Sequence, residues 1–313
     1  MVTDADRDDV RPRRLVEPTT GRPILMAPIR QGRPFFTGPD AIAKDCPFCP
    51  GQEHRTPKAI DSCRRNGSPD AGHDEPGWTV RAFPNKYPAN DHHIVVAEGD
   101  VHHEQSGDLD VATWCDVVAM WQRLVQTIER EPGVQCAFLF KNVGQPAGAS
   151  IAHSHSQVIG LGEPPPRLQL EQRSAAALGH CPWCATIAGA GAGGRLVVRT
   201  SDHVVVTPDP PKLPYETWVL PLRCDDDFVT TPIESLATAL QALFVAIRDA
   251  LRRPAWNLWL HRMPGQPFHW HFELQPRTGQ LAGLELGGDM YINSLPAAAA
   301  AQRLRGGLPQ GLR

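Results

Sequence analysis

The sequence predicts an α+β protein built from two similar halves, each a mostly antiparallel sheet with a packed helix. The main observation is a repeated order of features along the chain. A Cys-x-x-Cys pair is followed by a strand, a long amphipathic helix, a second strand and two histidines at a spacing of two, and this order occurs twice. The pairs are Cys46/Cys49 with His153/His155, and Cys181/Cys184 with His269/His271.

The elements of each half follow from hydrophobic spacing. A Pro/Lys turn precedes the first strand of each half, and apolar residues at helical spacing mark the helix after it. The expected elements are strands over 93–97, 137–141, 217–221 and 256–261, and helices over 109–131 and 232–252. Thr231, Pro232 and Glu234 predict a capping box at the start of the second helix. We expect a disordered tail over 1–14 and two halves over 15–170 and 171–313.

Composition excludes several classes of function. The formal net charge is −3, and a nucleic-acid binder would show a basic excess. No apolar stretch approaches the roughly 20 residues that span a bilayer, and the charged N-terminus lacks the apolar core of a secretory signal. We therefore expect a cytoplasmic protein with no nucleic-acid or membrane partner. Disulfides are disfavoured there, so the cysteine pairs indicate metal sites or redox motifs.

Each half offers four candidate zinc ligands, because zinc prefers Cys and His in tetrahedral geometry. In the first half they are Cys46, Cys49, His102 and His153, with His103 as the competitor of His102. In the second half they are Cys181, Cys184, Cys224 and His269. One zinc ion is expected in the first site and a second zinc ion in the Cys3His set. Closed four-ligand sites are structural, so we assign neither to catalysis.

His155 is the candidate nucleophile. Residues two apart in a strand share a face, so His155 would lie beside the metal-anchored His153. A neutral imidazole nitrogen can attack phosphorus and divide one transfer into two displacements. Gln157, on the same face, could donate to a phosphoryl oxygen. The small residues of the loop over 142–150 would let backbone amides approach phosphate, and Asn142 and Ser150 could add side-chain donors.

The segment Ala152-His-Ser-His-Ser-Gln157, after Lys141-Asn-Val-Gly144, resembles the active site of galactose-1-phosphate uridylyltransferases, a branch of the histidine-triad superfamily. Similar segments lie at 17–33, 83–89 and 282–293. The resemblance implies two tandem histidine-triad-like halves, with His155 nucleotidylated and Gln157 stabilising the intermediate. It implies the first zinc set above and a homodimer in which one subunit's C-terminal loop completes its neighbour's site. The implied substrate contacts are Arg30, Arg33, Asn85, Asn142, Ser150 and Glu285.

The family resemblance implies a nucleotidyltransferase of the UDP-glucose:hexose-1-phosphate uridylyltransferase type. It would move a nucleoside monophosphate from a nucleotide sugar to a sugar 1-phosphate. Several departures are closer to adenylyl-transferring relatives, which use phosphate to split ADP-sugars or adenylyl sulfate: Ser154 and Ser156 flank the second histidine, and Leu284 replaces a tyrosine. Two competing hypotheses are a hydrolase and a non-catalytic, zinc-stabilised nucleotide-binding module. We expect His271 to be a relic or core residue and Glu273 a structural partner.

Overall fold

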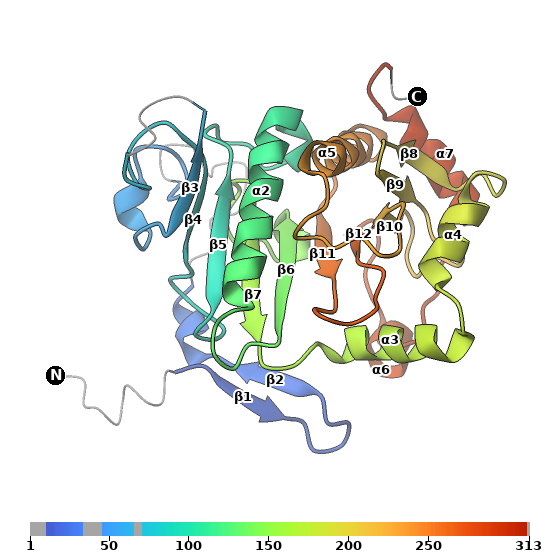
Figure 1. Cartoon of the computed structure of the whole chain (residues 1–313), viewed down its shortest axis with the longest axis horizontal. Helices are drawn as coiled ribbons and strands as arrows, with labels where there is room; N and C mark the ends of the chain where they lie inside the picture. The colour runs from blue at the N-terminus through green and yellow to red at the C-terminus, as the bar shows by residue number, and fades with distance from the viewer. Residues whose placement is uncertain (1–10, 34–45, 66–70, 312–313) are drawn as a thin grey trace.

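The computed structural model describes residues 11–33, 46–65 and 71–311. Its centre is a ten-stranded sheet in the order β3-β4-β5-β7-β6-β11-β12-β10-β9-β8, in which every neighbouring pair is antiparallel (Figure 1). The strands are β3 (Asp61–Arg64), β4 (Trp78–Pro84), β5 (His93–Glu98), β6 (Cys136–Val143), β7 (His155–Leu161), β8 (Leu196–Arg199), β9 (His203–Val206), β10 (Thr217–Pro221), β11 (Trp256–His261) and β12 (His271–Pro276).

The sheet has an internal twofold pattern. Strands β3 to β7 occupy the same relative places in one half as β8 to β12 in the other, and the halves join where β6 pairs with β11. Val143 lies opposite Trp256, and Phe140 lies opposite Trp259. The expected α+β class with two tandem, mostly antiparallel halves is therefore confirmed, and the halves share one continuous sheet.

Two long helices cover one face of the sheet (Figure 1). They are α2 (Val111–Ile128) and α5 (Ile233–Ala250), which pack against each other. Asp110 caps α2 by accepting a 2.7 Å hydrogen bond from the backbone of Thr113, as helix N-termini favour. The expected capping box at α5 is wrong: its N-cap is Pro232, and the Thr231 hydroxyl lies 2.9 Å from Nε2 of His203 instead.

Shorter elements surround this core. A separate hairpin consists of β1 (Arg13–Val16) and β2 (Pro23–Met26). Arg13 and Arg14, which were expected to belong to a disordered tail, lie in β1, and residues 1–10 of that expected tail lie outside the described residues. The remaining helices are α3 (Pro166–Leu178), α4 (Pro182–Ala190), α6 (Gly283–Gly288) and α7 (Ala297–Gly306). The short 3-10 turns are η1 (Pro28–Gly32), η3 (Glu53–Arg55), η4 (Ser106–Asp108) and η5 (Gln145–Ala147). In the part of the chain that the structure describes, no helix is both long and apolar enough to span a bilayer.

Candidate active site and metal centres

Strand β7 divides its side chains between the two faces of the sheet. Ser156 points to the helix side, where its hydroxyl accepts a 2.7 Å hydrogen bond from the indole of Trp121 in α2. Because successive side chains of a strand alternate, His155 and Gln157 point to the opposite face. Both line a cavity of about 300 Å³ on that face, within the usual range of small-molecule sites.

A backbone carbonyl fixes the tautomer of His155. Its Nδ1–H donates to the carbonyl oxygen of His153 at 2.7 Å, which leaves the lone pair on Nε2. Burial, together with the smaller effect of the positive charges of Lys141 and Arg33, lowers the pKa of His155 from 6.5 to about 4, against the opposing effect of that hydrogen bond. The ring is therefore neutral near pH 7, as a nucleophilic imidazole must be.

Cationic and hydroxyl groups complete the cavity wall. Arg33, Arg55 and Lys86 line it. Arg33 also donates to the Ser150 hydroxyl from Nε at 2.9 Å and from Nη2 at 2.5 Å. An array of cations around a neutral nucleophile suits a phosphate-bearing ligand.

The loop before β7 is shaped by two glycines with positive φ, Gly144 at 79° and Gly148 at 84°. A Cβ at Gly144 would lie 2.8 Å from the Cβ of Ala255. The position therefore needs both the left-handed conformation and the space that glycine provides. The loop ends at Ser150, which lies in the cavity wall.

The predicted substrate contacts are distributed unevenly. Asn85, Arg33 and Ser150 line the cavity together with His155 and Gln157. Three others are not among its lining residues. Arg30 donates at 2.6 Å to the carbonyl of Tyr87, which does line the cavity. Asn142 accepts from Asn257 at 2.7 Å, and Glu285 accepts from the backbone of Ala282 and Ile292. Glu285 is in α6, away from β7 (Figure 1).

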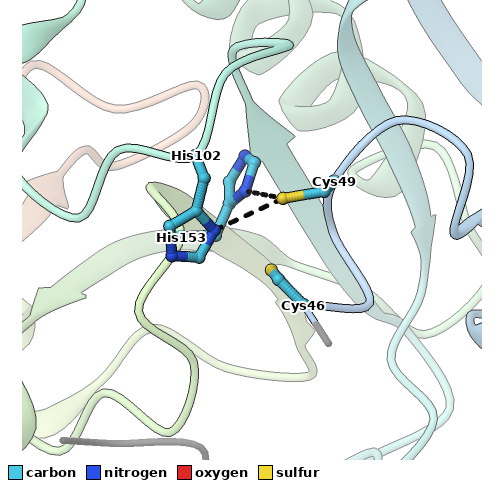
Figure 2. Close-up of side chains that lie close together, drawn as sticks. All are labelled: Cys46, Cys49, His102 and His153. Carbon is cyan, nitrogen blue, oxygen red and sulfur yellow. Dashed lines mark hydrogen bonds between the residues drawn. The ribbon is translucent and has the colours of Figure 1, made fainter. Parts of the chain in front are cut away.

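The four side chains of the first predicted metal set lie close together (Figure 2). The ligand atoms of Cys46, Cys49, His102 and His153 all lie within 4.8 Å of one another. The Cys49 sulfur lies 3.3 Å from Nδ1 of His102 and 3.5 Å from Nδ1 of His153. His103 does not join the cluster, and its carbonyl accepts a 2.6 Å bond from the backbone of Ser154.

Partners of the histidines suit metal binding in both halves. Nε2 of His153 donates to the Gly99 carbonyl at 3.2 Å, which turns Nδ1 toward the sulfur atoms. Ligating histidines commonly donate their second N–H in this way. The second set, Cys181, Cys184, Cys224 and His269, also lies within 4.8 Å. Here Nε2 of His269 donates to the Pro221 carbonyl at 2.9 Å. These donors fit zinc, which would hold the strand ends that precede β7 and β12.

The structure contains a third cluster of possible metal ligands, which was not predicted from the sequence. Glu171 of α3, His261 of β11, and His271 and Glu273 of β12 each direct a buried side-chain atom to a common centre. Among the residues that the structure describes, none of these atoms has a hydrogen-bond partner of acceptable geometry, although His261 Nδ1 lies 2.8 Å from a Glu171 oxygen. Two imidazoles and two carboxylates could also hold a divalent cation. Nothing near Glu171 or His261 in the sequence signals this arrangement.

Other residues of the cavity also escaped sequence reasoning. Phe48 lies between the two cysteines of the first pair. The centroid of its ring lies 5.3 Å from the ring centroid of His155 and 6.3 Å from that of His153. Arg55 and Lys86 line the cavity. Their signal was position alone: Phe48 stands inside Cys-x-x-Cys, and Lys86 stands in the Pro/Lys turn next to Asn85.

The chain is similar to nucleotidyl-transfer proteins. The family model described as the N-terminal domain of galactose-1-phosphate uridyl transferase matches residues 100–163. This segment contains His102, His153, His155 and Gln157. The match supports an enzyme of the nucleotidyltransferase kind.

Particular relatives extend this likeness over nearly the whole chain. An ADP-glucose phosphorylase of Arabidopsis thaliana is 26% identical over 332 aligned positions, covering 92% of this chain and 91% of the relative. A galactose-1-phosphate uridylyltransferase of Thermotoga maritima is 22% identical over 311 positions, covering 92% and 96%. The crystal structure of an Arabidopsis thaliana ADP-glucose phosphorylase with bound ADP-glucose superposes with a TM-score of 0.72, at 25% identity, covering 94% and 98%. The resemblance to the galactose-1-phosphate uridylyltransferase family is confirmed.

Proposed function

We propose that the protein transfers a nucleoside monophosphate from a nucleotide sugar through a covalent intermediate on His155. The observation that carries the proposal is the Nδ1–H bond of His155 to the His153 carbonyl, 2.7 Å long, which leaves the lone pair on Nε2 of a ring that lines a cavity together with Arg33, Arg55 and Lys86. A neutral imidazole held in one tautomer is the group that this displacement requires.

In the first step Nε2 of His155 attacks the α-phosphorus of the donor. The P–N bond forms, the bond from phosphorus to the bridging oxygen breaks, and the sugar 1-phosphate leaves with the electron pair. Gln157 and Arg33 donate hydrogen bonds to the phosphoryl oxygens. In the second step an acceptor phosphate oxygen attacks the same phosphorus, a new P–O bond forms, and the P–N bond breaks. The electron pair of the P–N bond returns to Nε2, which restores the neutral imidazole.

The acceptor that we propose first is inorganic phosphate with an ADP-sugar donor. The ADP-glucose phosphorylase relative supports this choice, because it matches at 26% identity over 92% of the chain. Transfer from a UDP-sugar to a sugar 1-phosphate, as in the uridylyltransferases, is the second candidate, supported by the family match over 100–163. Ser154 and Ser156 differ from the residues expected in the uridylyltransferases. This difference favours the first candidate, transfer from an ADP-sugar to phosphate.

We further propose that zinc occupies the first two Cys/His clusters, that the protein acts as a cytoplasmic homodimer, and that the halves divide near residue 170. When bound, zinc would cross-link the segments that carry the four Cys and His donors of each cluster, which is a structural role. Glu285 and the C-terminal segment around α6 would serve the cavity of the neighbouring subunit. Metal analysis tests the proposed zinc sites, and the mass of the protein in solution tests the proposed homodimer.

The test is to incubate the protein with α-phosphate-labelled ADP-glucose or UDP-glucose and to measure acid-labile, base-stable label on the chain. We expect label on His155, its loss in His155→Ala, and its discharge by phosphate or by a sugar 1-phosphate. His271→Ala is the matched control, because His271 makes the same Nδ1–H bond to the His269 carbonyl, 3.1 Å long. Release of label to water without acceptor would indicate a hydrolase, and absence of label with retained nucleotide binding would indicate a binding module.

A further inference from the structure

His93 is buried at the start of β5, directly beside the residues of the candidate active site. Its side chain is 3% exposed. Strand β5 pairs with β7 in a register that places Val95 opposite Gln157. Nε2 of His93 lies 2.9 Å from Oε1 of Gln157, so the ring meets the side chain that faces the cavity.

Backbone amides determine which way these side chains point, because a backbone N–H can only donate. The Ala89 N–H donates to Nδ1 of His93 at 3.0 Å. Nδ1 therefore carries the lone pair, and in the neutral ring the proton is on Nε2. It follows that Nε2–H donates to Gln157, and that the atom of Gln157 next to His93 is the carbonyl oxygen Oε1 rather than the amine.

Asn85 is oriented in the same way. The Tyr87 N–H donates to Oδ1 of Asn85 at 2.9 Å, which turns the Nδ2 amine toward Oε1 of Gln157 at 3.4 Å. Two donors thus converge on Oε1 of Gln157. Gln157 lines the cavity together with His155. Because Oε1 is held by these two donors, the Nε2 amine is the part of the Gln157 amide that remains for a ligand.

We infer that His93 is a positioning residue that holds the Gln157 amide with its donor edge toward a phosphoryl group. The inference rests on the proposed function, because it assigns the cavity a phosphate ester as ligand. Phosphoryl oxygens are acceptors, so a Gln157 amide in the opposite orientation would present its own oxygen to them and repel them. His93 removes that orientation without touching the substrate.

The test compares first-step rates in two backgrounds. Enzyme labelling by ADP-glucose, without acceptor, is followed in single turnover for wild type, His93→Phe, Gln157→Ala and the double variant. Losing one donor to developing charge costs a factor of about 10²–10³, so loss of its orientation should slow His93→Phe by roughly tenfold. In the Gln157→Ala background the same change should have no further effect. His92→Phe, at the neighbouring half-buried histidine, is the control and should match wild type.

Other outcomes would overturn the inference. A His93→Phe rate close to that of wild type excludes positioning, and an equal loss in both backgrounds shows a merely structural role. If His93→Phe does not fold, His93→Gln replaces it: its amide can donate to Oε1, and a rate as low as that of Gln157→Ala refutes the inference.

Failure of the proposed function is separately visible, since wild type would then carry no label. The inference is in that case judged on ADP binding by calorimetry. His93→Phe should weaken ADP binding in the wild-type background, where Gln157 is present. In the Gln157→Ala background, the same substitution should leave ADP binding unchanged. Equal ADP affinity with and without His93 would end the inference.

Discussion

A buried ion pair lies beneath the segment that carries His155, and its removal should be costly. Lys141 of β6 and Glu98 of β5 are both fully buried and in direct contact. Lys141 also donates to the Ser154 hydroxyl at 2.9 Å and to the His155 carbonyl at 3.1 Å. The Ser154 hydroxyl in turn donates to Glu98 at 2.8 Å. The network fixes the backbone between His153 and His155.

Lys141→Met leaves the Glu98 carboxylate buried and without its cation. Breaking a buried pair on one side costs about 3–5 kcal/mol, so we expect a loss of that size in the free energy of unfolding. The double variant Lys141→Met/Glu98→Gln removes both charges and should recover much of it, because replacing both members of a pair is often close to neutral. Labelling of His155 should remain slow in both variants, since the His155 carbonyl loses its donor.

The assay is urea denaturation followed by tryptophan fluorescence, with labelling measured on the folded fraction. The control is Arg223→Met, which breaks an exposed pair with Asp225 whose side chains are 76% and 73% exposed. Such pairs contribute at most about 1 kcal/mol. If Lys141→Met cost no more than Arg223→Met, or the double variant were less stable than the single one, the account of the buried charge would be refuted.

Three further predictions concern the site. Burial lowers the pKa of His155 to about 4, so its attacking neutral form persists on acidification. The value of kcat/KM for labelling should therefore stay constant down to pH 6.5 and be halved near pH 4. A midpoint near 6.5 in the pH profile would contradict this. Cys224→Ala should lower tightly bound zinc by about one ion per chain, measured by mass spectrometry after dialysis, since a closed site needs four ligands. Gly144→Ala should cost at least about 1–2 kcal/mol in denaturation, because φ is +79° and the new Cβ would lie 2.8 Å from that of Ala255; unchanged stability would show that the loop relaxes freely.

Local patterns predicted much of the fold because the chain repeats them. The strands expected over 217–221 and 256–261 are found at those residues, and the helices end within three residues of their expected limits. The clustering of Cys224 and His269 with Cys181 and Cys184 was predictable because each half repeats the other's spacing. An internal repeat indicates that two segments have the same structure, and it can be recognised from the sequence alone.

Interactions between distant segments were not predictable in this way. The pairing of β6 with β11 joins the halves through residues such as Val143 and Trp256, and neither carries a local signal for the other. The capping box failed for a similar reason: the Thr231 hydroxyl is used by His203 of β9, a tertiary partner that local propensity does not reveal. His93 likewise acquires its contact with Gln157 only when β5 pairs with β7.

The third cluster shows why equivalent histidines of the two halves differ in chemistry. His155 and His271 both begin the last strand of their half, and both lock Nδ1–H onto the carbonyl two residues earlier. Their Nε2 atoms have opposite surroundings: that of His155 belongs to a ring in a cavity with Arg33, whereas that of His271 lies 3.7 Å from Glu273 and 3.9 Å from Glu171. Carboxylates attract a cation or a proton and repel a phosphate. The duplicated fold therefore supplies two held imidazoles, and the neighbouring charges leave only His155 suited to attack phosphorus.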